Sequence, residues 1–167
     1  SAPLTLQVDD HTIIDDDTFD QADFLRRVAE SPNCPKSACP SPDHYKEAFE
    51  KAEKRAYGVT LTAELSGSYN SAMLARDLVL EERPELQIHI FNSRSASVGE
   101  TLITEKIQEC EEKGMEFSEV VETVENYINT QNTYFVLENL ETLRKNGRLS
   151  NLKAFVASAL KIKPVMG

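Results

Sequence analysis

Apolar and polar residues alternate along this chain with two different periodicities, one typical of strands and one typical of helices. Runs rich in β-branched and apolar residues predict strands at 57–62, 86–91 and 133–137. Apolar residues spaced three and four positions apart predict helices at 68–83, 101–113 and 118–128. Strands that alternate with helices in this way form a parallel sheet. The pattern therefore predicts an α/β fold, a mostly parallel sheet with helices on both faces.

The first thirty residues have a different pattern. Residues 4–8 and 11–14 are short β-like runs on either side of an acidic turn, which predicts a hairpin. Thr18 and Gln21 have the spacing of a capping box, and the residues after them predict a helix that ends near Glu30.

Four prolines then interrupt the chain, at positions 32, 35, 40 and 42. Each proline lacks an N–H group and disfavours helix at the residue before it, so we expect residues 31–40 to form an irregular loop. Ser41 and Pro42 are typical of a helix start, and apolar residues at helical spacing continue from there to Ala56.

The end of the chain predicts a second lobe. Residues 139–146 and 152–160 have helical spacing, and residues 161–167 alternate like a strand that nothing covers. The first residue is not methionine, and a strand-like run follows it almost at once. We therefore expect a fragment in which residues 1–138 form an α/β lobe, incomplete at its start, and residues 139–167 begin a truncated second lobe.

Composition narrows the classes of function. The chain has 167 residues, 40% of them hydrophobic, which is enough to bury a core. Its 28 acidic and 18 basic residues give a formal charge of −10, which repels nucleic acid and anionic lipid. No apolar run approaches the roughly 20 residues that span a bilayer, and three cysteines favour a reducing compartment. We expect a cytoplasmic protein without a nucleic-acid partner or stable membrane insertion.

Hydroxyl-bearing residues are concentrated after two of the predicted strands. One loop contains Ser66, Gly67 and Ser68, and the other, residues 92–97, contains Ser93. Ligands of parallel sheets bind beyond the carboxyl ends of the strands, where a glycine allows close approach and helix-start amides hold anions. The Ser66–Ser68 segment therefore suits a carboxylate or a phosphate. Serine and asparagine at these positions are also typical of simple helix caps.

Other kinds of site have weaker support. Cys34, Cys39 and His44 are too widely spaced for a typical zinc site, which needs four ligands in closer pairs. Ser66 lacks the first glycine of the nucleophile elbow of serine hydrolases. A sugar-phosphate-binding enzyme lobe is the stronger alternative, although the sequence has no nucleotide-binding glycine motif. Runs of acidic residues are interpreted as solvated surface.

Five segments in order resemble the DegV family. Residues 36–41 (KSACPS) are similar to the family's K-[TS]-S-Q-P-S, and residues 65–72 (LSGSYNSA) to its L-S-G-T-Y-x-S-A. Residues 92–93 (NS) occupy the place of its D-S. Residues 140–150 (LETLRKNGRLS) resemble L-x-x-L-x-x-G-G-R-[IL]-S, and residues 160–164 (LKIKP) resemble L-x-[IL]-K-P. The resemblance covers nearly the whole chain.

This resemblance implies a two-lobed protein that holds one long-chain fatty acid and presents it to a separate fatty acid kinase. It implies a carrier without a catalytic site, metal or cofactor. The carboxylate is expected to accept hydrogen bonds from Ser37 and Ser66, with Gly67, Ser68 and Ser93 also at the ligand. Arg148 matches the arginine of the G-G-R motif and is expected to contact the headgroup or the kinase.

Three residues depart from the family pattern. Ala38 replaces a serine, Cys39 replaces a glutamine, and Asn146 replaces the first glycine before the motif arginine. The motif of residues 36–41 therefore has lost one hydroxyl group.

Overall fold

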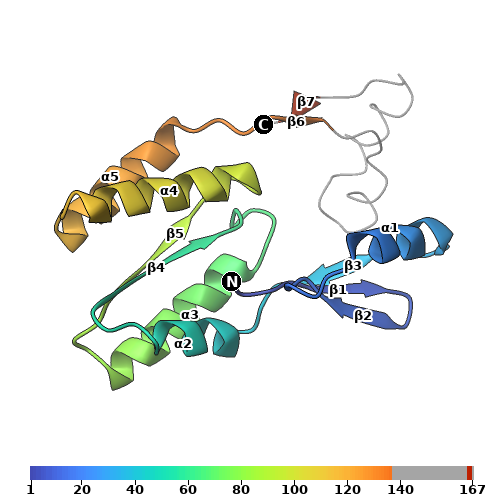
Figure 1. Cartoon of the computed structure of the whole chain (residues 1–167), viewed down its shortest axis with the longest axis horizontal. Coiled ribbons are helices and arrows are strands. Elements are labelled where there is room, and N and C mark those ends of the chain that lie inside the picture. The colour runs from blue at the N-terminus through green and yellow to red at the C-terminus, as the bar shows by residue number, and fades with distance from the viewer. Residues whose placement is uncertain (137–164, 167) are drawn as a thin grey trace. The chain divides into compact units, whose positions relative to one another are not determined.

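The computed structural model describes residues 1–136 and 165–166, which belong to two compact units (Figure 1). Unit 1 consists of Ser1–Ala38 together with Tyr134–Gly167, and unit 2 consists of Cys39–Thr133. The helices predicted within residues 139–160 and the predicted lobe boundary at residue 138 lie outside the described residues, so both stay predictions.

Unit 1 contains a small antiparallel sheet in the order β2-β1-β3. Its elements are β1 (Thr5–Val8), β2 (His11–Ile14), α1 (Gln21–Glu30) and β3 (Lys36–Ala38). The predicted hairpin is confirmed, with Val8 opposite His11 next to the turn.

Two predictions for unit 1 are wrong. Residues 31–40 are not wholly irregular, because β3 pairs with β1, with Leu6 opposite Ser37. The three residues of β3 lie between prolines and all keep their N–H groups, so they can pair with the open edge of the hairpin. The N-cap of α1 is Asp20 and not Thr18, since Asp20 Oδ1 accepts a hydrogen bond of 3.0 Å from the Asp23 amide.

The strand predicted at 133–137 has a different partner from the one expected. β6 (Phe135–Val136) pairs antiparallel with β7 (Val165–Met166), in a sheet separate from the parallel one. Both side chains of β6 are exposed, whereas a strand of a covered parallel sheet is buried on its faces. The apolar pattern of this segment was therefore correct for a strand but uninformative about the sheet it joins.

Unit 2 is built on two parallel strands, β4 (Arg55–Thr60) and β5 (Gln87–Asn92). α3 (Ser68–Glu82) connects them, so the predicted β-α-β unit is confirmed. The remaining helices are α2 (Pro42–Phe49), α4 (Val98–Glu112) and α5 (Phe117–Thr130).

Helices cover both faces of this parallel pair, as predicted (Figure 1). Alternate residues of β4 point to opposite faces, so Ala56 joins one core and Tyr57 the other. The first core comprises apolar side chains of α2 and α3, centred on Phe49, Ala72, Ala75 and Val79. The second comprises apolar side chains of α4 and α5, centred on Ile103, Val120, Val124 and Ile128.

The helix that begins at Pro42 is shorter than predicted. It ends at Phe49, and the Ala52 amide donates to the Phe49 carbonyl in the turn that follows. Ala52 and Ala56 pack against the same core as Phe49, and Ala56 does so from β4. The apolar residues three and four positions apart therefore do not form one helix face. They belong to different elements that contribute to the same core.

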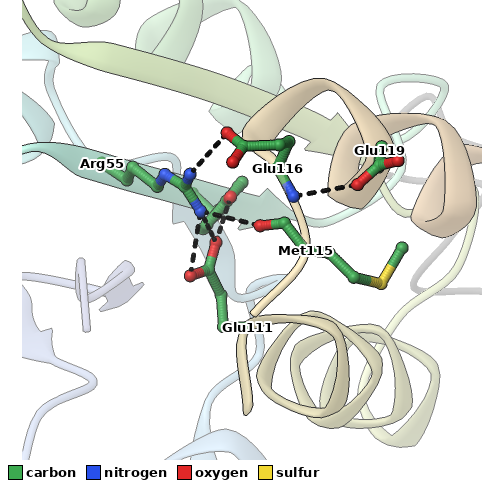
Figure 2. A network of polar contacts seen from close by, with 6 residues as sticks. Arg55, Glu111, Met115, Glu116 and Glu119 are labelled. Carbon is green, nitrogen blue, oxygen red and sulfur yellow. Dashed lines mark hydrogen bonds and ion pairs between the residues drawn. The ribbon is translucent and has the colours of Figure 1, made fainter. Parts of the chain in front are cut away.

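A polar network fixes the amino end of β4 to the corner between α4 and α5 (Figure 2). The Arg55 guanidinium donates to Glu111 Oε1 at 3.1 Å and to the Met115 carbonyl at 3.0 Å, and it approaches Glu116 Oε2 at 3.4 Å. The Tyr57 hydroxyl also donates to Glu111 Oε1, at 2.5 Å. In a parallel sheet, the loops that bind ligands follow the carboxyl ends of the strands. This network lies at the amino end of β4, so it stabilises the scaffold that carries the site described next.

Candidate ligand-binding site

The candidate site lies at the carboxyl ends of β4 and β5. Thr60 and Asn92 end the two strands opposite each other. The chain then enters α3 on one face of the sheet and α4 on the other. In open parallel sheets, the usual ligand position lies where two neighbouring strands send their loops toward opposite faces.

Hydrogen bonds connect the two loops. The Thr62 amide donates to the Ser95 carbonyl at 2.9 Å. Asn92 Oδ1 accepts from the Ala63 amide at 3.1 Å and from the Arg94 amide at 3.2 Å. The loops therefore form one structure, and Asn92, predicted only as a motif match, is the side chain that joins them.

Ser66 and Ser68 form a hydroxyl pair at the start of α3. Their Oγ atoms are 2.9 Å apart, and the Ser68 amide donates to Ser66 Oγ at 3.2 Å. Ser68 is only 3% exposed, whereas Ser66 is half-buried. The Tyr45 hydroxyl, from α2, is in hydrogen-bonding contact with Ser68, and burial raises the pKa of Tyr45. Ser66 is thus the accessible end of a short hydroxyl chain.

Thr60 contributes a further polar atom on the same side of the sheet. Its side chain is 2% exposed, and its Oγ1 has no hydrogen-bond partner among the described residues. By strand alternation Thr60 shares the face of Gly58, which packs against α2 and α3. A buried hydroxyl without a protein partner is costly unless something else bonds to it.

Gly67 is the N-cap of α3, with φ −72°, an ordinary right-handed conformation. A Cβ atom added there would lie 3.0 Å from Cys39 Sγ, which in turn is 3.8 Å from Ser71 Oγ. The close approach at Gly67 is therefore to the Cys39 side chain, and its contact with a ligand stays a prediction. Gly67 has no side chain to cap α3, and the first amide of the helix, that of Ser68, donates to Ser66 Oγ. The next amides of the first turn remain suited to an anion.

Ser93 lies inside the second loop. Its side chain is 1% exposed, its hydroxyl donates to the Ser95 carbonyl at 3.0 Å, and it accepts from the Ser95 amide at 3.1 Å. These contacts make Ser93 a loop-shaping residue in this structure, and its predicted contact with a ligand stays a prediction.

Backbone strain is concentrated in the same loop. Arg94 and Ser97 have φ values of 50° and 55°, which non-glycine residues seldom adopt. Ser95 holds this loop to the segment after α5, since its Oγ lies 2.6 Å from Thr133 Oγ1. Such strain persists only where surrounding contacts fix the backbone, as at ligand sites.

Glu100 adds a carboxylate to this edge of the sheet. It lies in the first turn of α4, and its Oε2 accepts from the Ser97 amide at 3.0 Å. The side chain is half-buried, and this burial raises the pKa of Glu100. The negative charge of Glu100 also contributes, as the smallest cause, to the raised pKa of Tyr45.

Sequence reasoning missed three of these residues: Tyr45, Thr60 and Glu100. Tyr45 follows the apolar spacing of α2 and resembles an ordinary core residue. Thr60 matches the β-branched pattern of its strand. The position of Glu100 three residues after Ser97 is a capping-box spacing and was the available signal.

The other predicted ligand residues lie elsewhere. Ser37 is an exposed residue of β3 in unit 1. Arg148 lies outside the described residues. The predicted convergence of Ser37 and Ser66 on one carboxylate therefore stays a prediction.

The weaker site types gain no support from the geometry. Within residues 1–136 and 165–166, no three His, Cys, Asp or Glu side chains are placed to hold a metal ion. The Ser66 hydroxyl contacts Ser68, whereas a serine nucleophile needs an adjacent base. In the same described part of the chain, no helix has the length and apolarity needed to cross a membrane.

Unit 1 has a separate groove of about 680 Å³. Its wall includes Lys36 and Asp9, and the Asp9 carboxylate is held by Ser31 at 2.9 Å and Asn33 at 2.7 Å. These bonds lower the pKa of Asp9, with Asn33 the larger cause. The carboxylate is engaged in shaping the turn.

Comparison with known proteins gives a consistent answer. The family described as "Uncharacterised protein, DegV family" matches residues 1–167. A DegV domain-containing protein of Streptococcus pneumoniae is 42% identical over 165 residues, 99% of this chain and 58% of that protein. The chain thus spans little more than half the length of this relative.

Two solved structures have the same fold. A DegV family protein from Ruminococcus gnavus, refined with vaccenic acid, is 58% identical with a TM-score of 0.86, over 89% of this chain and 54% of that one. The Streptococcus pneumoniae fatty acid kinase B3 protein, loaded with linoleic acid, is 41% identical with a TM-score of 0.90, over 98% of this chain and 58% of that one.

Proposed function

This chain belongs to the DegV family, and on that premise we propose that it binds one long-chain fatty acid. The carboxylate is bound by Ser66, supported by Ser68 and Gly67, together with Ser37. Ser93 shapes the adjoining loop and completes the polar end of the site. The two solved structures described above carry vaccenic and linoleic acid, which supports the choice of ligand class.

One observation carries the proposal: polar and apolar groups meet at the same edge of unit 2. The Ser66–Ser68 hydroxyl pair lies at the start of α3. Three large apolar side chains are exposed on the loop before α3 and the first turns of α4, namely Leu65 at 45%, Val98 at 67% and Leu102 at 41%. A ligand with an anionic head and an apolar tail matches both features.

The head and the tail make different contributions. A hydrogen bond to a charged acceptor contributes roughly 1.5–3 kcal/mol, and each buried CH₂ group about 0.8 kcal/mol. A long tail therefore supplies most of the affinity, and the hydroxyl groups fix where the carboxylate lies. This division suits a protein that must bind tightly yet leave the head in a defined place.

We further propose that the protein is a carrier and that a separate fatty acid kinase acts on the bound acid. The similarity to the fatty acid kinase B3 protein supports this partner. Arg148 is the candidate contact with the headgroup or the kinase. The proposal assigns no catalytic residue, metal or cofactor to the chain and places it in the cytoplasm.

A sugar-phosphate ligand is the second candidate, because the Ser66–Ser68 segment at the start of α3 also suits a phosphate. The exposed apolar residues of the same edge do not suit a sugar. Denaturing mass spectrometry of ligand extracted from the purified full-length protein separates the two. We expect one long-chain fatty acid per protein, and recovery of a sugar phosphate would overturn the proposal.

A further inference from the structure

The Asn92 side chain lies on the same face of the parallel sheet as the start of α3. Along β5, Ile88 and Ile90 pack in the core with α2 and α3, whereas Phe91 packs in the core with α4 and α5. Because side chains alternate between the two faces of a strand, Asn92 points to the α2 and α3 face. This is the face of unit 2 that carries the Ser66–Ser68 pair.

Two acceptors hold the start of the loop that leads from β4 to α3. Asn92 Oδ1 accepts from the Ala63 amide at 3.1 Å, and the Ser95 carbonyl accepts from the Thr62 amide at 2.9 Å. Two consecutive amides of this loop are thus bonded to the end of β5 and to the loop that follows it. Of the two acceptors, the one from Asn92 belongs to a side chain, so a substitution can remove it.

The turn that follows connects this attachment to Ser66. The Thr62 carbonyl accepts from the amides of Leu65 and Ser66, each at 3.1 Å. The Ser66 hydroxyl then lies 2.9 Å from the Ser68 hydroxyl. Ala63 lies inside this turn, so the bond to its amide helps to fix where the turn lies and where the Ser66 hydroxyl is placed.

We propose that Asn92 is a positioning residue of the ligand site, which fixes the loop that presents Ser66 to the ligand carboxylate. This inference rests on the proposed function. Asn92 Oδ1 joins the two loops, because it also accepts from the Arg94 amide at 3.2 Å. Arg94 has a φ of 50°, and a backbone in this conformation persists only where its surroundings hold it. Without the Asn92 acceptor, two backbone amides lose their bond and the loops are no longer fixed to each other.

The loss of this acceptor should affect the head of the ligand more than its tail. A displaced Ser66 hydroxyl forms a poorer bond to a carboxylate, and one charge-assisted bond is worth about tenfold in affinity. The contribution of an apolar tail depends instead on the area that it buries. Oleate and oleyl alcohol have the same tail and differ in the charge of the head, so the pair separates the two contributions.

The test compares Asn92→Leu and Asn92→Asp with the unchanged full-length protein by calorimetry. Leucine has a similar shape without an acceptor, and aspartate keeps the acceptor. We expect Asn92→Leu to bind oleate about tenfold more weakly and oleyl alcohol within about threefold of the unchanged protein. Asn92→Asp should recover most of the oleate affinity in about 1 M salt, where its added charge is screened over about 3 Å.

Amide hydrogen exchange reports on the two loops directly. The Ala63 and Arg94 amides should exchange faster in Asn92→Leu, and in Asn92→Asp they should exchange as slowly as in the unchanged protein. Asn126→Leu is the matched control, because Asn126 is exposed on α5, and it should change neither binding nor exchange. Asn92→Ala also removes the acceptor and provides the same comparison if Asn92→Leu does not fold.

Three outcomes would overturn the inference while leaving the proposed function intact. They are normal oleate binding by the folded variant without the acceptor, equal losses of oleate and oleyl alcohol affinity in that variant, and a loss in Asn92→Asp as large as in Asn92→Leu. The last would mean that the NH₂ group of Asn92, and not its oxygen, is the part that matters. Absence of oleate binding by the unchanged protein would instead refute the proposed function.

Discussion

Ser95 lies directly against Gly99. A Cβ atom added to Gly99 would be 1.9 Å from Ser95 Oγ and 2.6 Å from Ser95 Cβ. Ser95 itself is buried and bonded through its Oγ to Thr133. Because the Ser95 carbonyl also accepts from Thr62, this single contact helps to position both loops of the candidate site.

Replacement of Gly99 by alanine should therefore disturb the site as well as the fold. The new methyl group has no room, and overpacking of this kind costs roughly 1–3 kcal/mol. We expect urea denaturation of the full-length Gly99→Ala protein to show that loss, together with weaker binding of a fatty acid. Gly114→Asn is the matched control, because that position has open space and asparagine tolerates its positive φ of 70°. A fully stable Gly99→Ala protein would contradict the packing described.

Ser66→Ala should weaken fatty-acid binding by about ten-fold, which corresponds to ~1.5 kcal/mol for one charge-assisted hydrogen bond. Folding should be retained, since Ser66 is only half-buried. Equilibrium binding of oleate measures the effect, and Ser118→Ala, at an exposed position of α5, serves as the control. Unchanged affinity in Ser66→Ala would remove Ser66 from the site.

Thr60→Val tests whether the buried hydroxyl serves the ligand. Valine has the same shape and removes a polar atom that lacks a partner among the described residues. The ligand-free protein should become more stable by about 1 kcal/mol, because the cost of burying that atom disappears. Binding of oleate should become weaker. Thermal denaturation with and without oleate measures both effects, and a variant that loses stability while binding normally would show that Thr60 is purely structural.

Glu111→Gln tests the network at the opposite end of β4. The Tyr57 hydroxyl, and then Arg55, lower the pKa of the Glu111 carboxyl. A pKa lower in the folded than in the unfolded state gives stability that is present above the unfolded value and is lost as the pH falls. Since Glu111 is about one-third exposed, we expect a loss of only about 1 kcal/mol at neutral pH.

The difference between the unchanged protein and Glu111→Gln should shrink as the pH falls through the acidic range, where the carboxyl group of Glu111 is protonated in both folded and unfolded chains. Urea denaturation at several pH values checks this, with Glu112→Gln as the exposed control on the same helix. A difference independent of pH would mean that the charge of Glu111 contributes nothing.

The central part of the fold could be predicted from the sequence, because its signals are local. β4, α3 and β5 each show the periodicity of apolar residues that is typical of a strand or a helix, and their order specifies a parallel pair. The partner of β6 could not be predicted in this way. Pairing with β7 joins segments far apart in the chain, and the apolar pattern of Phe135 and Val136 says nothing about which strand lies beside them.

The candidate site, like the fold, could be predicted from the sequence only where its residues are close together in the chain. Ser66, Ser68 and Gly67 belong to one short loop, so their proximity follows from the sequence. The contribution of Tyr45 depends on α2 packing against α3, a tertiary relationship that the spacing of apolar residues does not reveal. Ser93 has the right place in the motif, but its two bonds within the loop appear only in the structure.

A crystal structure of the full-length protein with a bound long-chain fatty acid tests the central claim most directly. The account predicts that one carboxylate accepts hydrogen bonds, at about 2.5–3.0 Å, from both Ser37 Oγ and Ser66 Oγ, with the tail directed along apolar side chains. A carboxylate bound away from either serine, or the two hydroxyl groups facing different ligands, would contradict it.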